Sequence, residues 1–230
     1  MAATVTLCAG CDGILAGTEK LDRAVLGQLP GLRAISRCGV GMDSVDVAAC
    51  ADLGIQVRNT PMGPTRAVAE LTVGLVLDLL RQFTRMDREV RAGQWSKRMG
   101  NLLQGKRVGV VGYGRIGRAT AELLELFGTH VAFFDPFVLE ADRPRMELDD
   151  LLGWADIVTL HCSKTADACH LLDAGRLALM RRGSWLVNAG RGGLIDEDAL
   201  CALLSTGHIA GAAIDCFGKE PYDGPLTQLP

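Results

Sequence analysis

Short apolar runs and amphipathic stretches alternate along the whole chain. An apolar run of about four to eight residues predicts a strand, and apolar positions three and four residues apart predict a helix. In the first part of the chain these patterns predict strands at Gly13–Ala16, Arg33–Ser36 and Ile55–Arg58, with helices at Leu21–Leu29 and Val45–Leu53. Such alternation favours a parallel sheet covered by helices.

A break at Asn59-Thr60-Pro61 separates this part from a long predicted helix. Pro61 and Pro64 disfavour the helical conformation in the residues that precede them, so this segment is a predicted hinge. The helix is expected to run from Pro64, which suits a first turn, to Gly93, which suits a helix end. One apolar stripe at helical spacing is predicted to pack on the core: Val68, Leu71, Leu75, Leu79, Phe83, Met86 and Val90.

From Gly105 onward the alternation is clearer. The predicted strands are Arg107–Val111, His130–Phe134, Asp156–Leu160, Ser184–Asn188 and Ala210–Asp215. The predicted helices are Ile116–Phe127, Leu148–Trp154, Asp173–Met180 and Glu197–Ser205. Because the strands are continuously apolar, both faces of their sheet should be buried. We therefore expect an α/β fold with two domains, residues 1–60 and 61–230, the second a doubly wound parallel sheet of Rossmann type.

Composition and charge exclude several classes of function. The chain has 230 residues, of which 48% are apolar and 22% charged, enough to build a buried core. Its net charge is −3 and its basic residues are scattered, so no nucleic-acid partner is expected. No run reaches the roughly 18 apolar residues of a membrane span, and the start lacks the pattern of a signal peptide, so we expect a cytoplasmic protein without membrane contact.

The eight cysteines do not suggest a disulfide framework, because they are scattered through a chain of this length. Cys162, Cys201 and Cys216 lie in or beside apolar runs, where cysteine behaves as a small apolar residue. Cys8 and Cys11 form a C-x-x-C pair, but no second pair and no histidine lies near them in the sequence. We therefore predict no metal site.

A glycine-rich segment carries the clearest chemistry in the chain. Gly112, Gly114 and Gly117 form G-x-G-x-x-G between a predicted strand and a predicted helix. The first glycine permits a tight turn, the second lets the backbone approach a pyrophosphate, and the third lets helix and strand pack closely. The start of the helix offers unpaired N–H groups to the phosphates.

The next predicted strand is followed by an acid, Asp135. A carboxylate at this place can accept hydrogen bonds from the hydroxyls of an adenosine ribose and would repel a 2′-phosphate. The sequence therefore predicts a dinucleotide site that takes NAD rather than NADP. The alternative is a glycine-rich turn in a doubly wound fold without a cofactor.

Together these segments resemble the D-isomer-specific 2-hydroxyacid dehydrogenase family, and its phosphoglycerate dehydrogenase branch in particular. The resemblance extends beyond Gly112–Gly117 and Asp135-Pro136 to four further segments, which occur in the order typical of the family. They are Cys38–Asp46, Asn59–Pro61 with Ala69–Leu71, Asn188–Gly193 with Asp196-Glu197, and Gly211–Asp215 with Glu220-Pro221. The family resemblance implies a Rossmann domain joined to a flavodoxin-like substrate domain, which would be incomplete here.

The resemblance implies a role for two charged residues. Arg191 matches the arginine that binds the substrate carboxylate and polarises its carbonyl, and a guanidinium suits that task because its planar fork fits a carboxylate. Glu220 matches the glutamate that pairs with the catalytic histidine, where it would raise the pKa of the imidazole and orient it. The substrate implied is a 2-hydroxy or 2-oxo acid.

The resemblance also implies cofactor contacts at further positions. Arg115 and Ile116 match backbone contacts to the pyrophosphate, and Asp215 matches an acid at the nicotinamide end. The residues matching the walls of the adenosine and nicotinamide sites are His161, Cys162, Ala189 and Gly190, and Val40, with Gly41, matches a loop facing substrate and nicotinamide.

The family's catalytic histidine follows the Glu-Pro segment on the next strand, and this sequence ends at Pro230 before reaching it. We do not expect His130, His161, His170 or His208 to replace it. The family's first strand–helix unit, which precedes Asp12–Leu15, and the elements after its histidine are not found either. The sequence is thus expected to be the middle of such a dehydrogenase.

Two classes of function follow from these observations. The first is an NAD-dependent oxidoreductase acting on a 2-hydroxy acid, favoured because Arg191 and Glu220 are both present. The second is a non-catalytic NAD-binding module, such as a sensor or corepressor-like protein, or an inactive fragment, favoured by the missing proton donor. By resemblance a homodimer is expected, formed around Pro64–Gly93, although packing within one chain explains the apolar stripe equally well.

Overall fold

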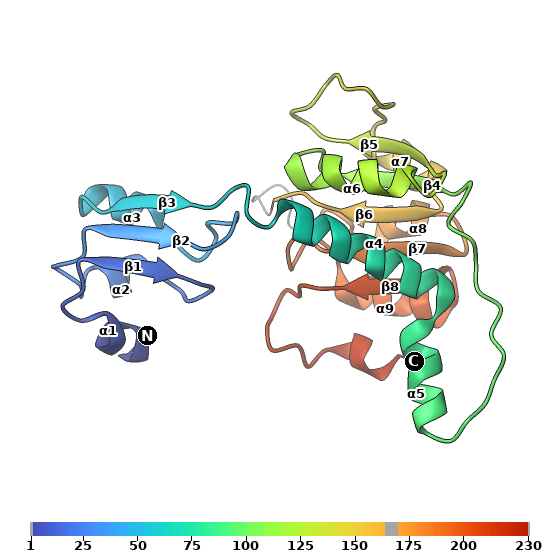
Figure 1. Cartoon of the computed structure of the whole chain (residues 1–230), viewed down its shortest axis with the longest axis horizontal. Helices are drawn as coiled ribbons and strands as arrows, with labels where there is room; N and C mark the ends of the chain where they lie inside the picture. The colour runs from blue at the N-terminus through green and yellow to red at the C-terminus, as the bar shows by residue number, and fades with distance from the viewer. Residues whose placement is uncertain (1, 164–169, 230) are drawn as a thin grey trace. The chain divides into compact units, whose positions relative to one another are not determined.

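The computed structural model describes residues 2–163 and 170–229 and divides into two compact units, Met1–Thr65 and Arg66–Pro230 (Figure 1). The smaller unit contains a parallel sheet of three strands in the order β1-β2-β3. Its strands are β1 (Gly13–Ala16), β2 (Ala34–Arg37) and β3 (Gln56–Asn59), close to the predicted positions. Its helices are α1 (Ala2–Cys8), which was not predicted, α2 (Arg23–Leu26) and α3 (Val47–Asp52).

Helix caps and one apolar cluster hold the smaller unit together. Asp22 and Asp46 accept hydrogen bonds from the amides of Val25 and Ala49, which are otherwise unpaired donors at the starts of α2 and α3. Apolar side chains from the helices pack on those of the strands, among them Leu26, Ile35 and Cys50. Burial of this cluster is what stabilises so small a sheet.

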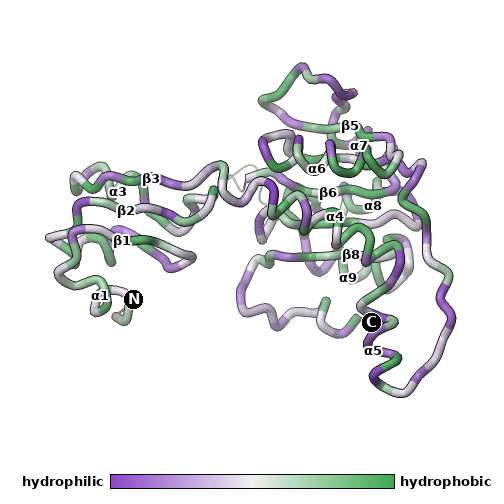
Figure 2. Tube along the Cα trace, viewed as in Figure 1, coloured by the Kyte–Doolittle hydropathy of each residue, from purple (hydrophilic) through white to green (hydrophobic). Residues whose placement is uncertain are grey.

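The larger unit contains a parallel five-stranded sheet in the order β5-β4-β6-β7-β8. The strands are β4 (Arg107–Val111), β5 (His130–Phe134), β6 (Ile157–Leu160), β7 (Ser184–Asn188) and β8 (Ile209–Ile214). Their apolar character is visible along the chain in Figure 2. The predicted α/β fold of Rossmann type is thereby confirmed.

Helices cover both faces of this sheet, as its apolar strands require. Helix α4 (Thr65–Arg81) and helix α6 (Arg115–Glu125) cover one face, where they share a cluster with Val110 and Phe133. The other face is covered by α7 (Leu148–Trp154), α8 (Ala174–Leu179) and α9 (Glu197–Ser205). A short 3-10 helix, η2 (Pro225–Gln228), follows β8.

The prediction of one long helix from Pro64 to Gly93 is wrong. The structure has two helices in this range, α4 and α5 (Phe83–Arg91), which are separated at Gln82. Gln82 has a φ of 58°, in the left-handed region. The carbonyl of Leu80 accepts the amide of Asn101 (2.8 Å), while the amide of Thr84 donates to the side chain of Asp78 (2.8 Å). These two bonds replace the one that would continue the helix.

The predicted apolar stripe is correct only in part, because Leu75 and Leu79 are half-buried and pack against the core cluster but do not form the most buried face of the helix. The buried residues of α4 are Ala69, Thr72, Val76 and Leu80, a face adjacent to the predicted one. Leu71 is exposed, and in α5, whose residues are all described, none is buried. The many apolar residues of α4 allow two neighbouring stripes, and contact with the sheet selects between them.

None of the helices in the described ranges has the length and apolar character that crossing a lipid bilayer demands.

Candidate active site

The order of the strands creates a switch point at the carboxyl ends of β4 and β6, which is where open parallel sheets have their ligand crevice. The chain passes from β4 to its neighbour β5 on one side and then crosses to β6 on the other side of β4. In an open parallel sheet, ligands bind at the carboxyl ends of strands where such connections diverge. The glycine-rich turn follows β4, so the fold places it beside this crevice.

Gly112 and Gly117 are required by close contacts within this turn. Gly112 has a φ of +91°, and a Cβ there would lie 2.6 Å from the amide nitrogen of Cys162. A Cβ on Gly117 would overlap the carbonyl oxygen of Gly112. Neither position accepts a side chain unless the backbone shifts. These contacts explain why two of the three motif positions are glycine.

Gly114 has a different reason to be glycine. Its φ of −76° suits any residue, and a Cβ there would meet nothing within 4 Å in the described chain. It is the N-cap of α6, which begins at Arg115 and Ile116, and within the described residues no side chain bonds to the first amides of this helix. Open space above unpaired N–H groups at the positive end of a helix fits a pyrophosphate.

Asp135 lies beside the same turn. One carboxylate oxygen accepts the amide of Tyr113 (2.7 Å), and the other accepts the amides of Phe137 and Val138 (2.8 and 3.1 Å). Three N–H donors fix the orientation of this carboxylate, whose two oxygens retain acceptor capacity. Asp135 is therefore held where an adenosine ribose would meet it.

A second interaction fixes the loop that follows Asp135. The buried ring of Tyr113 stacks on Phe133 (3.9 Å between ring centres), and its hydroxyl accepts a hydrogen bond from Arg143 (2.7 Å). Arg143 also forms two hydrogen bonds with Glu125 of α6, both 2.7 Å long. The loop carrying Arg143 is thereby tied to the helix that starts at the glycine turn.

His161 and Cys162 follow β6 and form the opposite side of the crevice. Burial lowers the pKa of His161 to about 4, so its imidazole is neutral at neutral pH. Its Nε2 lies 3.0 Å from Thr159 Oγ1, and its Nδ1 is buried without a hydrogen-bond partner among the described residues. Burial also raises the pKa of the Cys162 thiol to about 11, so this cysteine stays protonated.

Asn188, at the end of β7, organises the next loop although the sequence reasoning gave it no role of its own. Its side chain accepts the amide of Gly190 (3.1 Å) and donates to the carbonyl of Arg191 (3.0 Å), and its own carbonyl accepts the amide of Asp215 (2.9 Å). A fully buried polar residue at a strand end requires such partners, which is the signal that could have identified it.

This arrangement brings Ala189 and Gly190 to the crevice. A Cβ on Gly190 would lie 3.1 Å from the carbonyl oxygen of Leu160 and 3.3 Å from that of Cys162. The loop after β7 therefore lies directly against the end of β6, beside the predicted cofactor residues.

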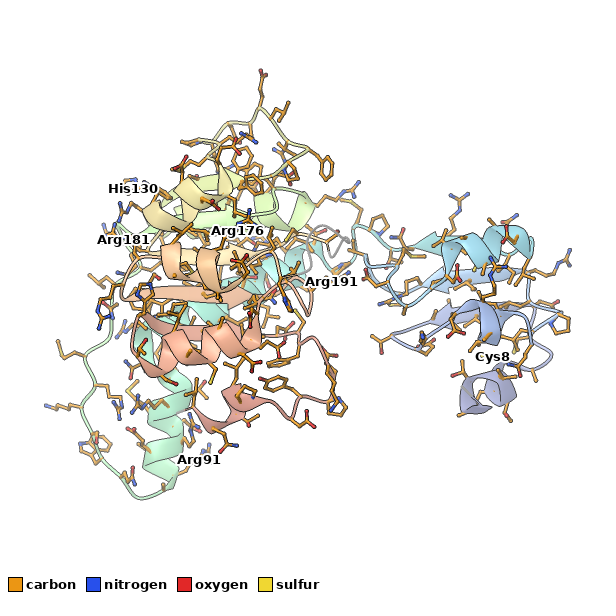
Figure 3. The ribbon with its side chains drawn as sticks, turned by 180° about the vertical axis from the view of Figure 1, so that it is seen from behind. Cys8, Arg91, His130, Arg176, Arg181 and Arg191 are labelled. Carbon is orange, nitrogen blue, oxygen red and sulfur yellow. The ribbon has the colours of Figure 1, made fainter. Side chains whose placement is uncertain are left out.

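Arg191 lies at this carboxyl-end edge of the sheet, opposite the edge where His130 and Arg181 precede their strands (Figure 3). Its Nη1 donates to the carbonyl of Gly190 (2.8 Å). Glu220 lies on the loop after β8, where Oε1 accepts the amide of Phe217 (3.1 Å). Both side chains are thus oriented by their own loops.

The Arg191 and Glu220 loops are in direct contact. A Cβ on Gly192 would overlap the carbonyl of Phe217 and lie 2.9 Å from the amide nitrogen of Gly218. The pKa of the Cys216 thiol is sensitive to the charges at this place. Burial is the largest cause that raises this pKa, to about 12, and the carboxylates of Asp215, Glu220 and Glu197 add to it. The charge of Arg191 acts in the opposite direction. The structure therefore brings the predicted acid-binding arginine and the predicted glutamate to one place.

Val40 belongs to the smaller unit, after β2. Its carbonyl accepts the side-chain amide of Asn59 (2.8 Å), and the amide of Gly39 donates to Thr60 Oγ1 (2.8 Å). These bonds hold the Val40 loop to the end of β3.

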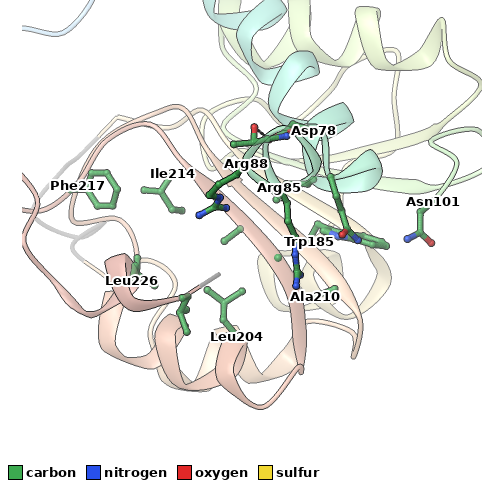
Figure 4. A pocket seen from close by; sticks show the side chains of 16 residues that line it. Asp78, Arg85, Arg88, Asn101, Trp185, Leu204, Ala210, Ile214, Phe217 and Leu226 are labelled. Carbon is green, nitrogen blue, oxygen red and sulfur yellow. Dashed lines mark hydrogen bonds between the residues drawn. The ribbon is translucent and has the colours of Figure 1, made fainter. Parts of the chain in front are cut away.

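A groove of about 520 Å³ lies elsewhere, along the edge of β8 (Figure 4). Arg85 and Arg88 of α5 point into it from one side, opposite Leu204 and Leu226. The lining described for it includes neither the glycine turn nor Arg191 or Glu220. The candidate site at the strand ends is thus distinct from this groove.

No group of three or more histidine, cysteine or acidic residues suited to a metal occurs in ranges 2–163 and 170–229. The seven cysteines described there, Cys8 and Cys11 included, are free.

Residues 73–230 match the NAD-binding domain of the D-isomer specific 2-hydroxyacid dehydrogenases. The chain belongs to this family. It is 40% identical over 226 residues to a glyoxylate reductase of Thermofilum pendens. The aligned region covers 92% of this chain and 67% of that protein. It is also 40% identical over 217 residues to a D-3-phosphoglycerate dehydrogenase of Mycobacterium leprae, of which it spans only 41%.

Solved structures show the same likeness. A crystal structure of a Thermus thermophilus protein superposes with a TM-score of 0.93 at 35% identity, covering 99% of this chain and 76% of that one. The D-lactate dehydrogenase of Aquifex aeolicus, complexed with NAD and lactic acid, has a TM-score of 0.84 at 29% identity, covering 94% and 67%. NAD is accordingly the cofactor of this domain, and the glycine turn, the start of α6 and Asp135 fit it.

We predict that Gly114→Ala mainly weakens NADH binding, whereas Gly117→Ala mainly lowers the free energy of unfolding. The methyl group of Gly114→Ala points into open space, so the free energy of unfolding should change by less than about 0.5 kcal/mol, while affinity for NADH falls about tenfold or more because the methyl group obstructs the phosphates. Gly117→Ala must displace the Gly112 carbonyl and should lower the free energy of unfolding by about 1–3 kcal/mol. Urea unfolding and NADH fluorescence titration measure the two effects, and Gly114→Ala binding NADH like the wild type would contradict the pyrophosphate assignment.

We predict that the neutral, buried His161 lowers the free energy of unfolding of the larger unit as the pH falls. Its pKa is about 4 in the folded protein and about 6.5 when unfolded, so only the unfolded chain takes up a proton between these values. The corresponding stability is present above pH ~6.5 and is lost as pH falls toward 4, up to about 3 kcal/mol. Urea unfolding of wild type and His161→Asn across this range should show a shallower loss in the variant; identical slopes would refute the prediction.

Proposed function

We propose that the protein is an NAD-dependent oxidoreductase that interconverts a 2-hydroxy acid and a 2-oxo acid. Residues 61–230 would form its NAD-binding domain and residues 1–60 part of a substrate-binding domain. The observation that carries this proposal is the contact between the Arg191 and Glu220 loops at Gly192 and Phe217. A domain that only held NAD would need neither charged side chain at that place.

Arg191 would bind the substrate carboxylate. Its guanidinium remains charged at every accessible pH and can form two parallel hydrogen bonds with a carboxylate. In the structure its Nη1 bonds to the carbonyl of Gly190, beside the cofactor crevice. There the guanidinium would engage the acid and polarise the neighbouring carbonyl.

Glu220 would act on the proton that moves with the hydride. Its carboxylate would orient an imidazole and favour the protonated form, as the resemblance implies for the family's catalytic histidine. Bound NAD supplies the hydride acceptor, or NADH the donor. The task of Arg191 and Glu220 is then to orient the acid and the family's histidine, which this sequence does not reach, toward the nicotinamide.

Asp135 supports NAD over NADP in this proposal. Its carboxylate, fixed by three amides, would accept ribose hydroxyls and repel a 2′-phosphate. Asp215, which follows β8, would lie at the nicotinamide end, and Val40 of the smaller unit stays a predicted cofactor contact. A phosphoglycerate dehydrogenase-like substrate is the narrower proposal, supported by the similarity to that enzyme of Mycobacterium leprae.

We also propose a cytoplasmic homodimer. The segment after α5 exposes large apolar side chains, including Trp95 (84% exposed) and Met99 (92%). Phe83 and Val90 of α5 are exposed as well. A second copy of this segment would bury such side chains, which supports a dimer formed around residues 83–102.

Arg191→Met tests the proposed reaction. In buffer containing imidazole, which can donate the proton in place of the family's histidine that this sequence does not reach, we expect wild-type protein to oxidise NADH with glyoxylate, hydroxypyruvate or 3-phosphohydroxypyruvate. The variant should lose about 100-fold in kcat/KM because the substrate carboxylate has no partner, while its affinity for NADH stays within about twofold. Arg191→Lys should lie between the two, since lysine keeps the charge without the planar fork.

Arg181→Met is the matched control, because Arg181 lies at the opposite edge of the sheet (Figure 3). It should leave kcat/KM unchanged. Saturable NADH binding with no turnover of any 2-oxo acid, or equal loss in Arg181→Met, would overturn the proposed role of Arg191.

A further inference from the structure

Glu197 is the first residue of α9 and bonds across to the Glu220 loop. Its Oε1 accepts the amide of Gly218 at 2.9 Å, over a sequence separation of 21 residues. The helix does not need Glu197 as its cap, because Asp196 is the N-cap and accepts the amide of Ala199 (3.0 Å). The Glu197 side chain therefore serves the loop rather than the end of its own helix.

Two carboxylates bind adjacent amides of that loop. Phe217 donates its amide to Glu220 and Gly218 donates its amide to Glu197. The ring of Phe217 also stacks on Tyr222 with 4.1 Å between ring centres. The Phe217-Gly218 peptide is thus the point at which the position of Glu220 is decided.

The same peptide is also in contact with the Arg191 loop. The Phe217 carbonyl lies so close to Gly192 that no side chain fits between them, and a Cβ on Gly218 would lie 3.8 Å from the amide nitrogen of Gly193. Glu197 and the Arg191 loop therefore both contact Phe217-Gly218. Loss of either contact would let the Glu220 loop move away from Arg191.

We propose that Glu197 is a positioning residue that holds the Phe217-Gly218 peptide against Gly192 and so sets the separation of Arg191 and Glu220. This inference rests on the proposed function, in which those two residues act on the substrate. Glu197 itself does not touch the substrate. Its effect is transmitted through one backbone amide, so an uncharged acceptor of the same length should preserve it.

The test compares Glu197→Ala, which removes the acceptor, with Glu197→Gln, which keeps it. Asp198→Ala is the matched control, because Asp198 is an exposed acid in the same first turn of α9. Hydrogen–deuterium exchange of the peptide covering residues 216–222 reports on the bond directly. A second readout is binding of oxamate, a 2-oxo acid mimic, to the NADH-saturated protein.

In Glu197→Ala we expect the Gly218 amide to exchange about three- to tenfold faster and oxamate to bind about three- to tenfold more weakly, the loss of one hydrogen bond to a charged acceptor. Affinity for NADH should stay unchanged, because the glycine turn is not touched. Glu197→Gln and Asp198→Ala should stay within about twofold of wild type in all three measurements.

Unchanged exchange in Glu197→Ala would overturn the proposal, as would weaker oxamate binding in Asp198→Ala to the same degree. Equal loss in Glu197→Gln and Glu197→Ala would also overturn it, because charge rather than the hydrogen bond would then be responsible. If the wild type binds NADH but not oxamate, the proposed function fails, and the exchange rates still decide whether Glu197 holds the loop.

Discussion

The turn after β4 lies so close to the end of β6 that its first glycine has no room for a side chain. Gly112 faces the His161-Cys162 backbone, and its carbonyl in turn leaves no room at Gly117. This contact brings the start of α6 over the strand ends, which places unpaired amides next to the crevice. The open space at Gly114 belongs to the same turn, as does Tyr113, whose amide donates to Asp135.

A second close contact, between Gly192 and Phe217, brings the loops of Arg191 and Glu220 together. Gly192 passes beneath the Phe217 carbonyl, so the loop carrying Arg191 and the loop carrying Glu220 are held in contact. Asn188, buried at the end of β7, joins this contact to the crevice because its polar groups bond to both the Gly190–Arg191 loop and Asp215. Two glycine contacts and one buried amide side chain thereby connect cofactor site and acid site.

Much of this could be predicted from the sequence, for identifiable reasons. Arg107–Val111 and Ser184–Asn188 were predicted with their observed bounds, because a parallel strand buried on both faces is a continuous apolar run. Gly112, Gly114, Gly117 and Asp135 were predicted because their roles depend on neighbours in the sequence. The break at Gln82 was not, since it depends on Asn101 taking the Leu80 carbonyl, a contact that no local pattern records.

The roles of Glu197 and Gly192 were likewise beyond the sequence alone, because each depends on a loop more than twenty residues away. The most buried face of α4 lies one residue position from the predicted stripe, of which only Leu75 and Leu79 pack on the core, since its abundant apolar residues leave the face undecided until the sheet selects it. Nonlocal contacts are thus the common element in what the sequence did not reveal.

The dinucleotide assignment is tested most directly by fluorescence titration of the wild-type chain with NADH and, separately, with NADPH. The geometry at the glycine turn and Asp135 predicts saturable NADH binding with a Kd below about 1 mM, and NADPH affinity at least about tenfold lower because its 2′-phosphate would meet the Asp135 carboxylate. No saturable binding of NADH would contradict the assignment of the crevice, and equal affinity for NADPH would contradict the role of Asp135.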